Sequence, residues 1–237
     1  MTTSIVISRY NENLEWINKL SLKANLFIYN KGQQFQIPAT IKQSKFINLP
    51  NVGRESHTWV YHIYKNYEDL SDNIIFLQGR IDDLGCMAFQ DISKYIKGLE
   101  KESFCASRFG LLTPFHWNND NLSIPWDKRY KKSWNQGKIS KNKLGFRKFS
   151  KQLFPNISLF VPTSYGGCFS VRKEAVQQYQ KNFYLKLLNF LDKHEHPIEA
   201  HYFERLWCYM FSKNSLLNKA ILDVFKTKIE RNLLNKF

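Results

Sequence analysis

Short runs rich in β-branched and aromatic residues alternate with segments of helical apolar spacing along this sequence. The runs are TSIVISRY (3–10), ANLFIYNKG (24–32) and DNIIFLQG (72–79), and they are separated by NENLEWINKL (11–20) and GRESHTWVYHIYKNYEDL (53–70). Strands that alternate with helices predict βαβ units, in which a mainly parallel sheet is covered on both faces. The sequence therefore predicts an α/β fold with three layers, α/β/α.

The remaining elements extend this pattern within one predicted domain, 1–237. A helix around 89–99, a fourth strand at SFCASRFG (103–110) and a strand that runs into a helix at YGGCFSVRKEAV (165–176) are expected. FYLKLLNFL (183–191) and PIEAHYFERLWCYMF (197–211) predict two further helices. The segment 111–162 is predicted to be an irregular insertion, basic and rich in aromatic residues. The segment 216–237 is predicted to be a basic amphipathic helix.

The net charge of +15 indicates an anionic partner, which could be nucleic acid, a membrane surface or a phosphorylated substrate. Ten basic residues and no acid lie between Lys128 and Lys151, which is also compatible with a solvated lysine-rich loop. The four cysteines form no CxxC pair, which favours free thiols in a reducing cytoplasm. No secretory signal or membrane span is expected, so the predicted location is cytoplasmic, peripheral at the inner membrane face if the basic segments bind lipid.

Polar residues cluster where the first three predicted strands end. In open parallel sheets, ligands bind beyond the carboxyl ends of the strands, where the strand order reverses. Asn11 is expected to cap the first helix and leave backbone N–H groups beside Arg9 to bind an anion. The alternative is that these residues simply mark where the chain reaches water. The expected ligand-binding residues at these ends are Arg9, Asn11, Glu12, Lys31, Gln78, Gly79 and Arg80.

Asp82 and Asp83 follow the third strand as adjacent carboxylates. Two neighbouring carboxylates repel each other, and a cation beside them removes that cost. Oxygen ligands suit Mg²⁺ or Mn²⁺, so the pair is a candidate metal site. The alternative is a helix N-terminus, where acids are favoured by the helix dipole.

Glu204 lies on the apolar face of the predicted helix 197–211, together with Phe203 and Trp207, whereas Arg205 is expected to point outward. A carboxylate in an apolar stripe must be paired, metal-bound or next to a cavity. Burial would raise its pKa, which suits a general base. A structural ion pair with an inward arginine is the competing interpretation, and Glu199 is the second candidate base.

Gly166 and Gly167 precede the strand of the 165–176 segment. Paired glycines allow a sugar or a diphosphate to approach the backbone closely, although an ordinary turn would need them equally. No Walker loop, GxGxxG, HExxH or nucleophile elbow is present.

Several motifs resemble a domain-of-unknown-function family of bacterial and fungal proteins: VISRYNENLEW, IYNKG, LPNVGRESHTWVYHI, IIFLQGR and FERLWCYMF. That family resembles GT-A-type glycosyltransferases. SIVISRYNE is similar to their first strand and nucleotide-binding turn, IIFLQGRIDD lies where they carry an Asp-x-Asp metal motif, and GGCFSVRKEAV is similar to their acceptor-side strand and helix. The spaced Asp-x-Asp is replaced here by adjacent aspartates, and no aspartate follows the second strand.

The resemblance implies transfer of a sugar from a nucleotide-sugar donor to a glycan or a lipid-linked glycan, with Mn²⁺ or Mg²⁺ at Asp82 and Asp83. Glu204, or else Glu199, would be the catalytic base, and Arg54, Glu55 and His57 are expected to line the site. Nucleic acid is not the expected partner. Two alternatives remain: a non-catalytic glycan-binding relative, or a nucleic-acid-binding module whose basic 126–151 segment offers Trp126, Tyr130 and Trp134 for base stacking.

Overall fold

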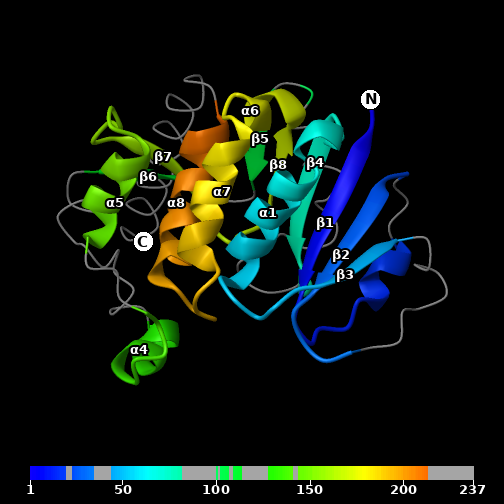
Figure 1. Cartoon of the computed structure of the whole chain (residues 1–237), viewed down its shortest axis with the longest axis horizontal. Coiled ribbons are helices and arrows are strands. Elements are labelled where there is room, and N and C mark those ends of the chain that lie inside the picture. The colour runs from blue at the N-terminus through cyan, green and yellow to red at the C-terminus, as the bar shows by residue number, and fades with distance from the viewer. Residues whose placement is uncertain are drawn as a thin grey trace, which may run out of the picture.

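A six-stranded sheet forms the centre of the molecule, in the order β3-β2-β1-β4-β8-β5 (Figure 1). The computed structural model describes residues 1–19, 23–34, 44–81, 100, 102–106, 109–113, 128–140 and 144–212. The pairs β1–β2, β1–β4 and β2–β3 are parallel, and β8 is antiparallel to both β4 and β5. The sheet strands are β1 (Thr3–Arg9), β2 (Asn25–Asn30), β3 (Lys45–Asn48), β4 (Asn73–Gln78), β5 (Phe104–Ala106) and β8 (Phe169–Arg172).

The sheet contacts an apolar core on each face because side chains alternate along its central strands. In β1, Val6 belongs to one core cluster, whereas Ile5 and Ile7 belong to the other. All three are nearly inaccessible to solvent, as expected for a central parallel strand. The expected mixed α/β fold with a mainly parallel sheet is therefore confirmed.

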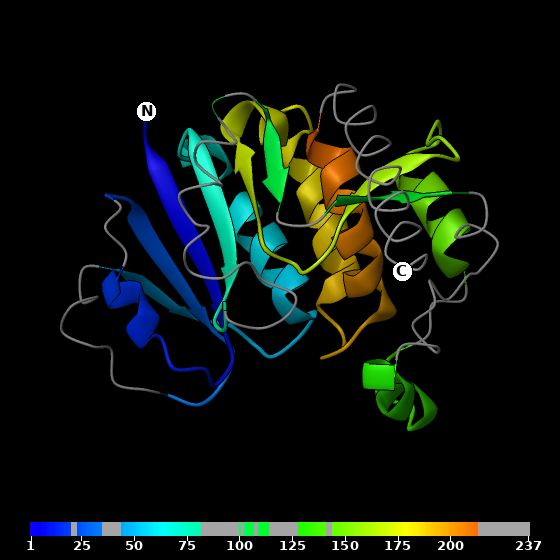
Figure 2. The same cartoon turned by 180° about the vertical axis from the view of Figure 1, so that it is seen from behind.

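Three helices cover one face: α1 (Arg54–Lys65), α7 (Lys181–Leu191) and α8 (Ile198–Phe211). They lie in front of the sheet in Figure 1 and behind it in Figure 2. The layer is joined to the sheet largely by aromatic packing. Between ring centroids, Trp207 of α8 lies 5.8 Å from Phe169 of β8, and Trp59 of α1 lies 5.1 Å from Phe76 of β4. The short elements η3 (Tyr67–Asp69) and α6 (Lys173–Gln177) complete the connections on this side.

The opposite face is covered, among the described residues, by the 3-10 helix η1 (Glu15–Lys19). Leu14 and Ile17 pack there with the isoleucines of β1 and with Leu77. An α-helix was expected over 11–20, and it is replaced by this shorter turn. Asn11 was expected to cap the N-terminus of this helix, but Asn13 occupies that role, because its Oδ1 accepts a hydrogen bond from Glu15 N. The Oδ1 of Asn11 instead accepts a hydrogen bond from Gln33 N. The helix expected around 89–99 lies outside the described residues.

The segment predicted to be irregular, 111–162, contains regular structure. It includes α4 (Lys128–Asn135) and α5 (Gly145–Leu153), and β6 (Phe109–Leu112) pairs with β7 (Val161–Ser164) as a separate two-stranded sheet. Phe146, Phe149 and Leu153 recur at helical spacing and are buried, so α5 is amphipathic. The density of basic residues on its other face concealed this pattern. The expected fourth strand is likewise divided into β5 and β6, and the edge strand β3 was not predicted.

Cys168 is disulfide-bonded, whereas Cys105 and Cys208 are free thiols. The expectation of free thiols is therefore wrong for Cys168, and the cysteines no longer support a reducing compartment. None of the described helices has the length and apolar character needed to cross a membrane. The predicted tail helix, 216–237, lies outside the described residues.

Phe149→Ala should lower the free energy of unfolding by about 3–5 kcal/mol, because it removes a fully buried ring from a close-packed core. The Phe149 ring lies 5.1 Å from that of Phe190 and 5.5 Å from that of Phe203, so it joins α5 to both α7 and α8. Urea denaturation measures the change. Lys148→Ala, at an exposed position of the same helix, is the matched control and should leave the midpoint nearly unchanged.

Candidate functional site

A cavity of about 400 Å³ lies at the carboxyl ends of β1, β2 and β4. The chain leaves β1 for β2 and β3 on one side and returns to β4 on the other, so the strand order reverses between β1 and β4. This is the position at which open α/β sheets bind ligands. The lining residues are Ser8, Arg9, Tyr10, Glu12, Lys31, Asn51, Arg54, Glu55, Gln78, Arg80, Glu195 and His196.

Seven of the residues expected at the site line this cavity: Arg9, Glu12, Lys31, Arg54, Glu55, Gln78 and Arg80. Four basic and three acidic side chains contribute to its wall, so the cavity is strongly polar but carries little net charge. Such a mixture offers cationic donors to a phosphate and carboxylate or amide acceptors to hydroxyl groups. A ligand that combines phosphate with sugar hydroxyls would meet both requirements.

Arg9 organises the cavity wall through carbonyl oxygens. Its guanidinium donates to the carbonyl oxygens of Glu12 at 3.0 Å, Tyr10 at 3.1 Å and Gln33 at 3.1 Å, and to Asn30 Oδ1 at 2.5 Å. Burial lowers the pKa of Arg9, although Glu12 opposes this change. Arg9 therefore ties the loop after β1 to the loop after β2, and a role in donor binding stays a prediction.

Lys31 holds the start of α1 from the end of β2. Its Nζ donates to the carbonyl oxygens of Val52 and Arg54, each at 2.5 Å. The side chain is buried, and this burial lowers its pKa to about 7 against the opposing effect of Glu55. Charge on Lys31 is thus disfavoured by burial and favoured by two carbonyl oxygens and a nearby carboxylate.

The turn that Lys31 holds is strained. Gly53 and Arg54 have φ of 64° and 52°, and the left-handed region costs a residue with a Cβ about 1–2 kcal/mol. Strained backbone of this kind is concentrated at functional sites, where the surrounding structure stabilises it. Gly53 N donates to the carbonyl oxygen of His194 at 2.8 Å, and Arg54 N donates to that of Glu195 at 3.2 Å.

The loop between α7 and α8 therefore completes the cavity wall, and sequence reasoning missed it. Glu195 Oε1 accepts a bond from Asn51 Nδ2 at 3.1 Å, and His196 lies beside it in the lining. Burial lowers the pKa of His196, with Arg54 adding to the effect. The run DKHEHP (192–197) was the available signal, because it concentrates titratable side chains in a short connection.

Glu55 and Gln78 lie against the paired glycines. A Cβ placed on Gly167 would approach Gln78 Nε2 to 2.9 Å and Glu55 Oε1 to 3.1 Å, and the φ of this residue is +70°. Trp59 Nε1 donates to the Gly167 carbonyl oxygen at 3.1 Å. Gly166 and Gly167 are not among the lining residues. They form the close turn that lets the Glu55 and Gln78 side chains occupy the wall.

Glu204 does not have the environment expected of a general base. It accepts bonds from Arg205 NH1 at 2.6 Å and from Gly166 N at 2.8 Å, and its side chain is 20% exposed. Burial alone would raise its pKa, but Arg205, His201 and the Gly166 amide outweigh burial and hold the pKa far below its usual range. The expected rise in pKa is therefore wrong, as is the expectation that Arg205 points outward. The structural ion pair, considered as an alternative, is what forms.

The remaining expected site residues lie near the cavity or outside the described residues. Neither Glu204 nor Glu199 lines the cavity, and neither do Asn11, Gly79 and His57. His57 is buried beside Lys31, and burial, together with the Lys31 charge, lowers its pKa to about 3. Asp82 and Asp83 lie outside the described residues, and in the described part of the chain no three His, Cys, Asp or Glu residues are grouped as a metal site would require.

Fold and site together define a mixed α/β protein with a polar cavity at the topological switch point of its sheet. Residues 5–221 match the model of a family described as protein of unknown function (DUF3431), so the chain belongs to this family. Comparison with curated proteins gave no match. A solved structure of CMP:2-keto-3-deoxy-manno-octonic acid synthetase complexed with CTP is similar over 76% of this chain and 77% of that chain, with 12% identity and a TM-score of 0.36. A similarity this low supports no argument about function.

Stability should rise between pH 7 and pH 10 because of Lys31. Its pKa is about 7 in the folded protein and 10.5 as a free side chain, so the unfolded chain binds more protons in this interval. Below pH 7 both states carry the charge and the contribution is constant. Urea denaturation measures the free energy of unfolding of the unmutated protein and of Lys31→Met. The value for the unmutated protein minus the value for the variant should increase as pH rises from 7 to 10. A difference that stays constant from neutral to alkaline pH would contradict the lowered pKa.

Proposed function

We propose that this protein is a glycosyltransferase, which moves a sugar from a nucleotide-sugar donor to a glycan or a lipid-linked glycan. The observation that carries the proposal is the polar cavity at the β1–β4 switch point, to which Arg54, Glu55, Gln78 and Arg80 contribute from α1 and the end of β4. The resemblance of the SIVISRYNE, IIFLQGRIDD and GGCFSVRKEAV motifs to GT-A-type enzymes supports the same function.

The donor diphosphate would be bound by the arginines of the cavity. Arg54 lines the cavity from the start of α1 and Arg80 lines it from the segment after β4, and we assign both to the diphosphate. Arg80 is exposed and lies two residues after the end of β4, and a guanidinium offers paired donors to phosphate oxygens. Mn²⁺ or Mg²⁺ at Asp82 and Asp83, two and three residues further along, would neutralise charge on the departing diphosphate.

Glu55 is the carboxylate that we assign to the acceptor hydroxyl. It lines the cavity, its side chain is 15% exposed, and it lies at the start of a rigid helix rather than in a loop. A general base must be within hydrogen-bond reach of the proton it removes, and Glu55 meets this condition better than Glu204 or Glu199. Arg54 Nε lies 3.5 Å from Glu55 Oε2 and would hold the carboxylate in position.

Donor binding can be tested by a thermal-shift panel of nucleotide sugars, with and without Mn²⁺. A donor at about 100 times its Kd should raise the melting temperature by roughly 5–10 °C, because it binds only the folded state. Arg80→Ala should reduce this shift, since it removes a phosphate donor from the cavity wall. Arg147→Ala on α5, at an exposed position that does not line the cavity, is the matched control and should keep the full shift. An unchanged shift in Arg80→Ala would contradict the assignment.

Glu55→Gln should lower the transfer rate by about 100-fold or more while donor binding persists, because the amide keeps the shape but cannot accept a proton. Release of the nucleotide in the presence of acceptor measures this rate. Glu204→Gln is the comparison variant, and it should mainly lower the melting temperature because it weakens the contacts to Arg205 and Gly166. If Glu204→Gln instead abolishes turnover in a stable protein, the base is Glu204. Donor binding by the unmutated protein without any turnover would favour a non-catalytic relative.

A further inference from the structure

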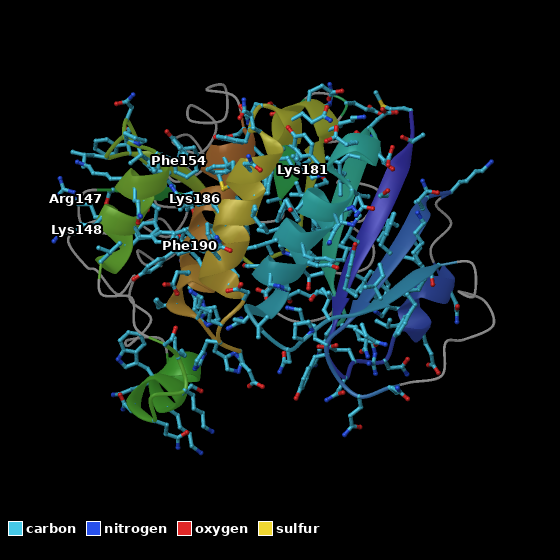
Figure 3. The ribbon with its side chains drawn as sticks, in the orientation of Figure 1. Arg147, Lys148, Phe154, Lys181, Lys186 and Phe190 are labelled. Atoms are coloured by element: carbon cyan, nitrogen blue, oxygen red, sulfur yellow. The ribbon has the colours of Figure 1, made fainter. Side chains whose placement is uncertain are left out.

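We infer that the α5–α7 surface is a docking site for an anionic lipid membrane. This surface consists of the outward side chains of α5 and α7, and Figure 3 labels Arg147 and Lys148 at the outer edge of α5 with Lys186 and Phe190 on α7. The inference goes beyond the proposed sugar transfer, because it concerns a surface that does not line the cavity. Its members are Leu144, which directly precedes α5, and Arg147, Lys148, Lys151, Leu185 and Lys186.

The two helices form one continuous surface because aromatic contacts join them along their length. Near one end the Phe149 and Phe190 rings are 5.1 Å apart, and near the other the Phe154 and Phe183 rings are 5.9 Å apart. Phe149 also packs on Phe203 of α8, so both helices rest on the core of the domain. The surface is therefore a fixed part of the fold.

The charge on this surface is uncompensated within the two helices. Neither Gly145–Leu153 nor Lys181–Leu191 contains an acidic residue. Lys181, at the start of α7, lies 4.0 Å from Glu68 and is not counted with the others. Arg147, Lys148, Lys151 and Lys186 are all exposed, and like charges so placed repel one another. An anionic partner would remove this repulsion.

Exposed leucines distinguish a membrane from a nucleic acid as this partner. Leu144, which directly precedes α5, is 42% exposed. Leu185, next to Lys186, is 39% exposed. Aliphatic side chains flanked by lysine and arginine are typical of surfaces that lie on lipid headgroups. Single-stranded nucleic acid would instead need open aromatic faces, whereas the phenylalanines here pack against one another.

The surface is linked to the cavity through the loops at the ends of its helices. The chain leaves α7 directly for His194 and Glu195, whose carbonyl oxygens accept bonds from the Gly53–Arg54 turn. Ser140, five residues before α5, donates from its backbone N to the carbonyl oxygen of His196 at 3.0 Å. A membrane bound at this surface would therefore lie beside the same loop that closes the cavity.

Sedimentation with lipid vesicles tests the inference on the full chain. We expect binding to vesicles of phosphatidylcholine containing about one fifth phosphatidylglycerol, little binding to pure phosphatidylcholine, and loss of binding at about 0.5 M salt. The triple variant R147Q/K148Q/K186Q should bind about 100-fold more weakly, since each basic residue contributes roughly fivefold at an anionic surface. The matched control K23Q/K45Q/K65Q removes the same charge from exposed positions elsewhere and should keep most of the binding.

A second variant tests the apolar contribution and separates the two kinds of anionic partner. Leu185→Ser should weaken vesicle binding several-fold and leave binding to a single-stranded oligonucleotide unchanged. Absence of vesicle binding, equal binding to both vesicle types, or equal losses in the two triple variants would overturn the inference. The inference would also be overturned if the unmutated protein bound the oligonucleotide more tightly than the vesicles and Leu185→Ser bound vesicles as well as the unmutated protein does. Vesicle binding needs no sugar donor, so its result is independent of the result of the test for sugar transfer.

Discussion

The contact between the Lys31 ammonium and the carbonyl oxygens of Val52 and Arg54 is the constraint on which the site depends. It joins the end of β2 to the left-handed turn at Gly53–Arg54, which the loop after α7 holds from the other side. That turn fixes where α1 begins, and so where Arg54 and Glu55 enter the cavity. A buried lysine whose pKa is lowered to about 7 is a costly way to hold a turn. Such a cost is typical of a site that is organised for a ligand.

Burial and pairing act in opposite directions on the charged groups of this protein, and their balance decides which group can do chemistry. Glu204 is paired so closely with Arg205 and Gly166 that its pKa falls, despite burial. Its role is to hold the glycine turn, on whose other side lie Glu55 and Gln78. The candidate base thus moves from α8 to the start of α1, although Glu204 remains indirectly connected with the site through the Gly166–Gly167 turn.

Basic side chains occur in two places with different surroundings. In the cavity, basic side chains are mixed with carboxylates and amides, which suits one small ligand with several kinds of polar group. On α5 and α7, basic side chains stand among exposed leucines with no acid in either helix, which suits an extended anionic surface. The net charge of +15 gives only the excess of basic over acidic residues in the whole chain, so composition could not distinguish these two environments.

The sequence by itself determined the α/β class, the strands that became β1, β2 and β4, and the polar residues at their ends, because these depend on local periodicity and on the general rule for parallel sheets. It also identified the buried face of α8. Only the tertiary structure decided which polar residues meet. Glu195 and His196 reach the cavity from far along the chain, and Glu204 meets the backbone N of Gly166, 38 residues earlier. Pairing between distant groups depends on distances that no local pattern encodes, and those distances set the charge and pKa of each candidate residue.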